Sequence, residues 1–479
     1  MITKLCNIFV CAATLALAVS PALAQFPDDA LRLGLSGYGV GARSLGMGNA
    51  YTGVANDYSA IYWNPAGLAQ LQSSEFSVGL SFLNNKDIST LLGTQETYNS
   101  TATNLNSLGL VYKLPTERGS FVLAFGYDRQ SNFTGGMSFS AFDPTSSIIQ
   151  SFAHNGTYYP SDLSNNIAYQ LYLADVDTLT GKFTSPINGK VNQSAKVVEG
   201  GGLNNWSLAA ATDIAKNLSL GVTLTYLSGT YRYDRNFVEA DPGHSWETFP
   251  YDFSSLTLDE YIEGDISGAN AKFGLMYRIP DRFRLGIGIK TPTSFTVKEN
   301  FGTTARSTFD GGDVYPTDKP FETTGSDQYD VVTPWVFSAG VSLTFGDLLL
   351  SGDADYTDWT ELKFENANSD VLAQNQGMKT LFRSAANYRG GLEYDIARLG
   401  IRLRGGFIYN QSPYAGDPTS FDRKFITGGL GFLLGQSTML DLAYARGWYD
   451  TFRYNYDGSP RTDEKVTTDN IFMTLSYRF

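Results

Sequence analysis

Segments of about ten residues in which apolar side chains alternate with small or polar ones recur along this chain after residue 70. The last segment is the clearest, because Ile471, Met473, Leu475, Tyr477 and Phe479 share one face while Thr474, Ser476 and Arg478 share the other. A period of two predicts a β-strand whose two faces meet different surroundings. The chain therefore has to fold as a set of two-sided strands.

Fourteen such strands are predicted, an even number, as single-chain outer-membrane barrels have. They lie near 75–84, 105–114, 119–130, 203–213, 217–233, 262–279, 283–298, 328–345, 348–363, 382–396, 399–411, 422–435, 437–454 and 465–479. Tight turns such as Pro115–Arg118 and Gly346-Asp347 alternate with long links, of which 131–202 is the longest. Short turns at one end and long loops at the other are typical of a transmembrane barrel.

A soluble sandwich or propeller fits the charge pattern poorly. Only 17% of the residues are charged, against about 25% in ordinary soluble domains. Several charges lie on the minority face of otherwise apolar strands, where a barrel lumen would accommodate them. They are Arg284, Lys290, Arg389, Glu393, Asp395, Arg402 and Arg404. We therefore predict an all-β fold, an antiparallel transmembrane β-barrel with short helices in its extracellular loops.

The N-terminus has the form of a secretory signal peptide over residues 1–24. Lys4 supplies the positive charge, Ile8–Val19 the short apolar core, and Ala22-Leu23-Ala24 the cleavage site. Both cysteines of the chain lie in this segment, so the mature protein would hold no disulfide. Export by this route agrees with a location in the cell outer membrane.

Residues 25–72 show no alternation and are dense in glycine, which permits close backbone approach and positive φ. We predict that they form a compact N-terminal hatch inside the lumen, and that residues 73–479 form the barrel. Asp57–Ala60 is expected to start a short helical turn that Asn64-Pro65 ends. A wide, open polar porin would have an empty lumen, so this segment argues against one.

The stretch from Gly41 to Ala69 resembles the N-terminal hatch of the FadL/TodX family of outer-membrane transporters for long-chain fatty acids and other hydrophobic compounds. The small-residue run Gly41–Gly48, the stretch Ala55–Ala60 and Asn64-Pro65-Ala66 stand in family order. Barrel segments around Thr333-Pro334 and Arg389–Tyr394 are also similar to the family. The loops, which choose the substrate in that family, match nothing recognisable.

The resemblance implies passive passage of hydrophobic molecules, long-chain fatty acids first. Loops would capture the molecule, a lumen pocket would hold it, and a kinked early strand would release it sideways into the bilayer. The residues expected to form or gate the hatch are Gly46, Gly48, Asn64, Pro65, Ala66, Gly126 and Asp128, with the kink on the third strand near Gly126–Asp128. The alternative is a non-transporting barrel of the same family, acting as a secretion-associated shuttle or a surface-binding protein.

Two groups of residues are expected to bind the ligand. Large apolar side chains gather in the predicted loop 236–263, where they form a lid over the barrel, a capture groove for an apolar ligand, or both: Trp246, Phe249, Tyr251, Phe253, Leu256, Leu258 and Tyr261. A stripe at helical spacing in the longest loop (Leu163, Ile167, Leu171, Ala174) is expected to pack onto that lid. In the lumen, Arg284, Lys290, Arg402 and Arg404 are candidate cations for a carboxylate head group.

Catalysis is not expected. The two histidines, His154 and His244, lack a serine or aspartate at a triad-like spacing, so we predict neither enzyme activity nor a metal site or cofactor. The net charge of −13 argues against nucleic-acid binding. The expected partners are a hydrophobic small molecule, outer-membrane lipid and lipopolysaccharide, with the protein a monomer.

Overall fold

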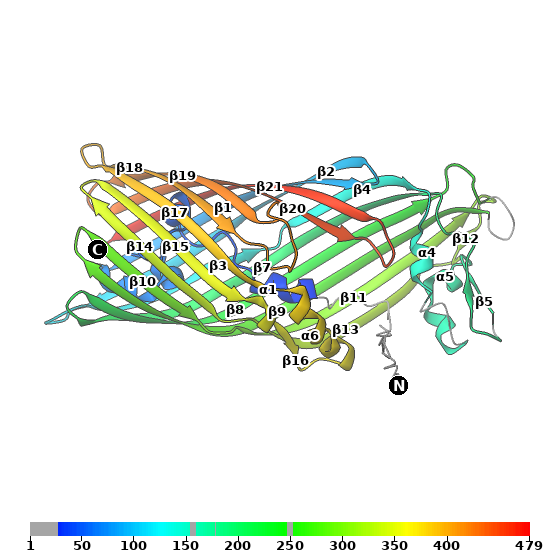
Figure 1. The fold of residues 1–479 in the computed structure, drawn as a ribbon, viewed down its shortest axis with the longest axis horizontal. Coiled ribbons are helices and arrows are strands. Elements are labelled where there is room, and N and C mark those ends of the chain that lie inside the picture. Colours follow the sequence, from blue (N-terminus) through cyan, green and yellow to red (C-terminus); the bar gives the residue numbers. More distant parts are fainter. Residues whose placement is uncertain (1–26, 154–159, 178, 247–251) are drawn as a thin grey trace, which may run out of the picture.

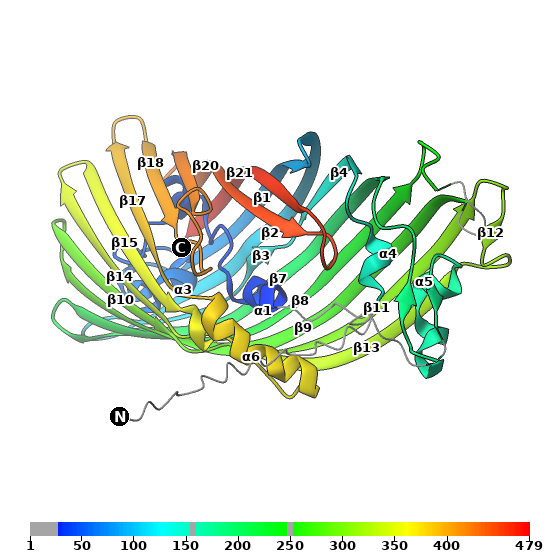
Figure 2. The same cartoon turned by 45° about the vertical axis from the view of Figure 1, so that its right-hand side comes forward.

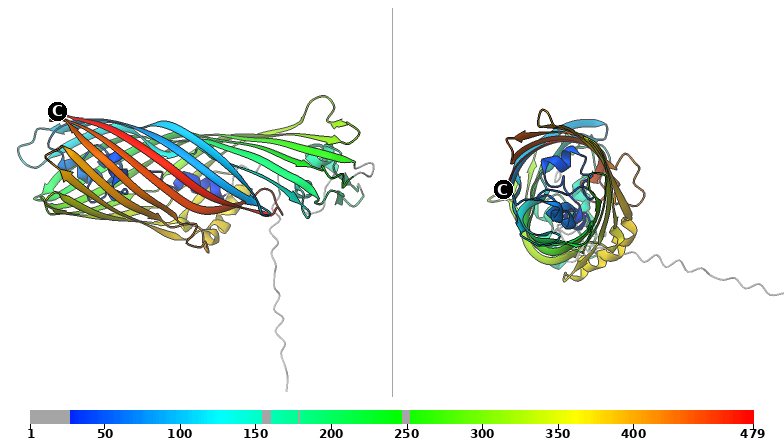
Figure 3. Two further views of the ribbon diagram at one scale, coloured as in Figure 1. Left: turned by 90° about the horizontal axis from the view of Figure 1, so that it is seen from above. Right: turned by 90° about the vertical axis from the view of Figure 1, so that its left-hand side faces the viewer.

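The chain forms a closed antiparallel β-barrel of fourteen strands, the predicted number. The structure is a computed structural model that describes residues 27–153, 160–177, 179–246 and 252–479; the predicted signal peptide lies outside these residues. Figure 3, seen along the barrel, shows a closed wall around the N-terminal segment. Among the described helices none is long and apolar enough to cross a membrane.

All fourteen predicted strands are present, and four of them consist of two elements separated by a break. The continuous strands are β1 (Glu75–Leu91), β2 (Thr94–Leu114), β7 (Val191–Ala215), β8 (Leu218–Ala240), β9 (Phe253–Ile279), β17 (Ser384–Ile396), β18 (Ile401–Asn410), β19 (Arg423–Leu434), β20 (Thr438–Tyr454) and β21 (Arg461–Arg478). The interrupted ones are β3 (Phe121–Asn132) with β4 (Gly135–Asp143), β10 (Phe283–Lys290) with β11 (Ser294–Phe309), β13 (Phe321–Val332) with β14 (Val336–Phe345), and β15 (Leu348–Asp358) with β16 (Lys363–Glu365). Pairing of β1 with β21 closes the barrel.

The alternating pattern has its apolar side outward. Ile471, Met473 and Leu475 are 41–49% exposed, whereas Phe472 and Thr474 between them are buried. Exposed large apolar side chains recur in this way on β1, β2, β3, β8, β10 and β19. A soluble sandwich would bury these faces, so the outward apolar band identifies a surface made for lipid.

Residues 27–72 lie inside the barrel, where four short helices replace strand structure: α1 (Pro27–Gly34), α2 (Ala42–Gly46), α3 (Ala60–Trp63) and the 3-10 helix η1 (Pro65–Gln70). As expected, α3 ends where Asn64-Pro65 begins. The segment packs against β7, β8 and β9 through η1 and against β18–β21 through α2. We refer to it below as the hatch.

The strands of one half of the barrel extend far beyond those of the other half (Figure 1). Two predicted loops are largely strand in this extension. Residues 85–104 form a hairpin that turns at Leu92-Gly93, and 253–261 belong to β9. The prediction placed loops here because these outer strand ends lack the long apolar alternation of the lipid-facing segments.

The described residues between 144 and 190 form an outer cap on this extension, with α4 (Ile148–Ser151), the 3-10 helix η3 (Pro160–Asn165), α5 (Ile167–Gln170) and the small pair β5 (Asp175–Val176) and β6 (Phe183–Thr184). On the shorter half, η4 (Trp359–Glu361) and α6 (Ser369–Leu381) lie at the rim, as Figure 2 shows. The Asn368 side chain caps α6 by accepting from Asp370 and Val371. Strand β12 (Val314–Tyr315) pairs with the outer end of β11.

Candidate functional site

Asn64 joins the hatch to the barrel wall. Its amide nitrogen donates to the carbonyl oxygens of Thr52 (3.1 Å) and Leu275 on β9 (3.2 Å), and its oxygen accepts from the Ala66 amide (3.2 Å). The side chain is fully buried. It thus satisfies polar backbone groups of both hatch and wall, which would otherwise be buried without partners.

Glycines of the wall provide the space for this turn. A Cβ atom on Gly274 of β9 would lie 2.1 Å from the Asn64 side-chain oxygen, and one on Gly221 of β8 would lie 2.3 Å from the Pro65 carbonyl carbon. Strand glycines mark places where another backbone approaches closely. Pro65 and Ala66 therefore sit directly against β8 and β9.

Gly46 and Gly48 meet the opposite wall. The Gly46 carbonyl accepts from the Thr427 hydroxyl (3.2 Å). Gly48 has φ 62°, and a Cβ on it would lie 2.7 Å from the Gly390 oxygen and the Phe407 nitrogen. Both predicted hatch glycines are thus positions where hatch backbone touches barrel backbone.

Arg43 of α2 connects the hatch to a buried charge cluster. Its guanidinium makes two hydrogen bonds to the Glu393 carboxylate (2.7 and 2.8 Å). Arg404 binds the same carboxylate (2.7 Å) and Asp441 (2.6 Å), and its side chain is completely buried. The expectation that Arg404 meets a head group is therefore replaced by an ion-pair role, since both its carboxylate partners come from the protein.

The lumen between hatch and rim contains a cavity of about 460 Å³. Lys290 of β10, one of the predicted ligand cations, lines it, together with Lys272 of β9 and Arg389 of β17. Lys272 donates to the Tyr62 carbonyl of the hatch, and Arg389 pairs with Asp355 (2.5 Å). This is where the structure gathers cations around open space.

The remaining predicted cations lie elsewhere. Arg402 pairs with Asp395 (3.1 Å), with both side chains partly exposed near the tight-turn end. Arg284 lies close to the β9–β10 turn, opposite Arg278 in the strand register, and is absent from the cavity lining. Strand alternation predicts that a side chain faces the lumen, but it does not predict the height of that side chain along the barrel. Arg284 and Arg402 lie nearer the tight turns than the cavity does.

The wall is interrupted beside this cavity. Pairing of β2 with β3 runs only to Ser107 and Asp128, and the β3 ladder with β7 shifts register between Arg129 and Ser131. The strand resumes as β4, which pairs with β7 and not with β2. The cavity lining includes Asp128 and every residue from Gln130 to Gly135, so open space reaches the interruption.

The interruption begins where the sequence placed the kink, at Asp128, and not at Gly126. Gly126 is still paired with Gly109, and the two glycines leave room for the Tyr58 ring: a Cβ on Gly126 would lie 2.1 Å from its hydroxyl oxygen. Asp128 is buried and accepts from the Asn205 amide (2.7 Å). Gly126 thus provides the space into which the Tyr58 side chain of the hatch packs.

Three consecutive glycines in β7 lie opposite the interruption. Gly201 and Gly202 have φ of 97° and 150°, which side chains rarely allow. The Phe133 amide donates to the Gly201 carbonyl (3.2 Å), and the Arg129 guanidinium donates to the same oxygen (2.7 Å). Arg129 and this glycine run therefore hold the distorted wall in place.

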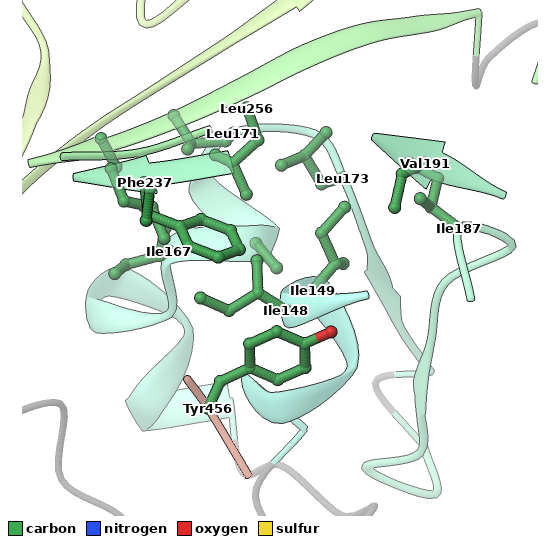
Figure 4. Packing of buried hydrophobic residues seen from close by; sticks show 14 of the residues in the cluster. Ile148, Ile149, Ile167, Leu171, Leu173, Ile187, Val191, Phe237, Leu256 and Tyr456 are labelled. Atoms are coloured by element: carbon green, nitrogen blue, oxygen red, sulfur yellow. The ribbon is translucent and has the colours of Figure 1, made fainter. Parts of the chain in front are cut away.

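Part of the apolar cluster predicted in the loop 236–263 belongs to the core of the outer cap. Phe253, Leu256 and Leu258 are at most 1% exposed and pack with Ile167 and Leu171 of the cap. Figure 4 shows Leu256 next to Leu171 in this cluster. Trp246 donates from its indole nitrogen to the Gly189 carbonyl (3.1 Å). The packing expected for the stripe Leu163, Ile167, Leu171 and Ala174 is confirmed.

The contacts of the described residues favour the lid over the capture groove. The side chains of Phe253, Leu256 and Leu258 are buried and have no surface free to meet an incoming ligand. Tyr261 is 36% exposed, and its ring lies beside Gly302 on the neighbouring strand. Phe249 and Tyr251 lie outside the described residues.

A polar network ties the cap to the barrel rim. The buried Glu239 carboxylate accepts from the Ser147 hydroxyl (2.6 Å), the Ile148 amide (2.7 Å) and the Gln193 amide (2.9 Å). The Tyr456 hydroxyl, in the β20–β21 turn, bonds Ser146 (2.7 Å). Burial raises the pKa of Tyr456 to about 12, so this hydroxyl stays protonated at neutral pH. The cap is thus held on both sides of the interruption.

Sequence reasoning missed Lys272, Arg389 and Arg129 as site residues. Lys272 alternates with outward-facing Phe273, so the period of two could have found it. Arg389 was recognised as a lumen charge but not as a cavity residue. No sequence signal pointed to Arg129, whose role depends on a register shift.

Comparison with known proteins gives a consistent result. The sequence profile described as outer membrane protein transport protein (OMPP1/FadL/TodX) matches residues 183–479. The search of curated proteins found no match.

Solved structures share the fold over nearly the whole chain. A Pseudomonas aeruginosa FadL homologue is 17% identical, covering 92% of this chain and 98% of its own at a TM-score of 0.55. The Pseudomonas putida toluene transporter TodX is 13% identical, covering 92% and 99% at 0.54. The monoaromatic hydrocarbon channel CymD is 15% identical, covering 92% and 98% at 0.53.

Proposed function

Because the chain belongs to the outer membrane protein transport protein family (OMPP1/FadL/TodX), we propose that it carries hydrophobic molecules, long-chain fatty acids first, across the outer membrane without energy input. The observation that carries the proposal is the continuity between the lumen cavity and the interrupted wall at β3. A ligand in that cavity has a route toward the bilayer, so lateral release needs no passage through the hatch.

The hatch closes the alternative route down the barrel axis. It is fixed to the wall by Asn64 on one side and by the Arg43–Glu393 pair on the other. In this proposal the hatch keeps polar solutes out and supports the floor of the cavity. Deleting residues 27–72 should turn a closed barrel into a conducting pore in planar bilayers; unchanged conductance would refute the plug role.

The exposed surface of the outer cap would capture the ligand at the cell surface. The buried side chains of the cap would serve only to stabilise the cap. Tyr172 is 62% exposed and Leu179 is 95% exposed on the cap. Burying an acyl chain there would contribute about 25 cal/mol per Å² of apolar area. The protein would act as a monomer in contact with lipid and lipopolysaccharide.

The test blocks the wall interruption. Ser131 lines the cavity at the register shift, so Ser131→Trp should fill the exit and reduce transfer of a fluorescent fatty acid into the membrane of proteoliposomes. The matched control is Leu123→Trp on the same strand, which is 38% exposed on the outward face. Both variants should keep a heat-modifiable barrel. Equal transfer by both would remove lateral release from the mechanism and favour the shuttle alternative.

A further inference from the structure

Two lysines face each other in the lumen without a carboxylate between them. Lys272 and Lys290 are register partners on β9 and β10, so their side chains leave the sheet on the same face. Like charges directly opposite each other across two strands are destabilising. Within the described part of the chain, the Lys290 ammonium makes neither a hydrogen bond nor an ion pair. An anion bound between the two ammonium groups would remove this repulsion.

Arg389 extends the cationic group. Its side chain is only 7% exposed and is held by Asp355. One of its terminal nitrogens, Nη1, is buried without a hydrogen-bond partner. Guanidinium nitrogens are donors only, so Arg389 keeps unused donor capacity at the edge of the cavity that it lines. Asp355 offsets the charge of Arg389, which leaves the two lysines for an anion.

The surroundings of this group offer hydrogen bonds that an alkyl chain does not use. The neighbouring wall of the cavity is formed by small hydroxyl and amide side chains, including Thr223, Thr225, Asn270 and Ser338. Hydrogen-bonding groups of this kind favour ligands with polar substituents.

The hatch adds two aromatic rings, Tyr62 and Trp63, to the same cavity. The rings stand edge to face with centroids 4.9 Å apart. Lys272 lies 4.9 Å from the Tyr62 ring centroid and Arg389 lies 5.6 Å from that of Trp63. Aromatic rings beside cations suit a ligand that combines a ring with an acid.

We propose that the lumen cavity also takes hydroxylated aromatic monocarboxylates, with the carboxylate between Lys272 and Lys290 and within reach of Arg389. The wall hydroxyls and amides would bond the ring substituents, and Tyr62 and Trp63 would contact the ring. The inference rests on the proposed passage through the lumen and adds a second substrate class to it.

The experiment measures binding of para-hydroxybenzoate to the detergent-purified protein by calorimetry, with para-cresol as the uncharged analogue. Saturable binding of the acid, at least tenfold tighter than that of the cresol, is expected. Lys290→Gln should weaken binding of the acid at least tenfold. The melting temperature should not fall, because the Lys290 ammonium has no partner in the described protein to lose. Lys298→Gln, an exposed lysine on β11, is the matched control and should bind as the wild type does.

Three results would overturn the inference: no saturable binding of the acid, equal affinity for acid and cresol, or unchanged affinity in Lys290→Gln. A fluorescent fatty acid separates the two proposals when its binding is measured on the same samples and its transfer to the membrane is measured in proteoliposomes of the same protein. If the fatty acid binds and the aromatic acid does not, only this inference fails. If the aromatic acid binds but no acyl chain reaches the bilayer, lateral release fails while the anion site stands.

Discussion

Replacing Glu393 by glutamine tests how the hatch is held. The carboxylate accepts three hydrogen bonds, two from Arg43 and one from Arg404, at 2.7–2.8 Å. The Arg43 and Glu393 side chains are 12% and 8% exposed, and that of Arg404 is fully buried. Water therefore cannot replace the lost carboxylate.

Removing one partner of a buried ion pair costs about 3–5 kcal/mol, because the other charge stays buried. Arg404 keeps Asp441 and Arg43 keeps Asn56 and Asp57 in the variant. Asn56 and Asp57 belong to the hatch itself, so the contact that is lost is the one between Arg43 and the wall, and most of the loss falls on the docking of α2. A loss of about 3 kcal/mol corresponds to about a 100-fold larger open fraction of the hatch. The barrel itself keeps its strand ladders and should remain heat-modifiable.

Hydrogen exchange read by mass spectrometry is the assay, since amide exchange reports local opening free energies. Peptides covering residues 42–48 should exchange about 100-fold faster in Glu393→Gln, and brief conductance bursts should appear in planar bilayers. Arg402→Gln is the matched control: its partner Asp395 is 37% exposed, and such surface pairs contribute about 1 kcal/mol or less. Unchanged hatch exchange in Glu393→Gln would refute the reasoning.

Three further changes probe the anchor, the wall and the cap. Asn64→Leu should cost about 1–3 kcal/mol by leaving buried backbone groups unpaired, seen as faster exchange in η1; equal exchange would make the residue a turn former only. Gly202→Val places a Cβ 2.3 Å from the Arg129 guanidinium and should change acyl transfer, whereas Gly200→Ala, with open space around it, should not. Phe253→Ala should loosen the cap by about 3–5 kcal/mol in exchange experiments, and the same result for the exposed Leu179→Ala would contradict the lid assignment.

The sequence alone was sufficient to predict the barrel and its number of strands. A strand that separates lipid from lumen must alternate, and residues 471–479 carry that alternation whatever their neighbours are. Tight turns such as Gly346-Asp347 then fixed which strands pair, because a two-residue link leaves no other partner. The glycine density of 25–72 and Asn64-Pro65 likewise indicated a compact, non-strand segment in a crowded space, since these are local backbone properties.

Only the tertiary structure decided what the lumen charges do. Arg404 and Lys290 look alike in sequence, each a cation on the small-residue face of a strand. Arg404 meets Glu393 and Asp441 from two other strands and is neutralised, whereas Lys290 meets Lys272 beside open space. Their difference depends on strand register and on height along the barrel. Those quantities are set by residues far apart in the chain, so no local pattern could contain them.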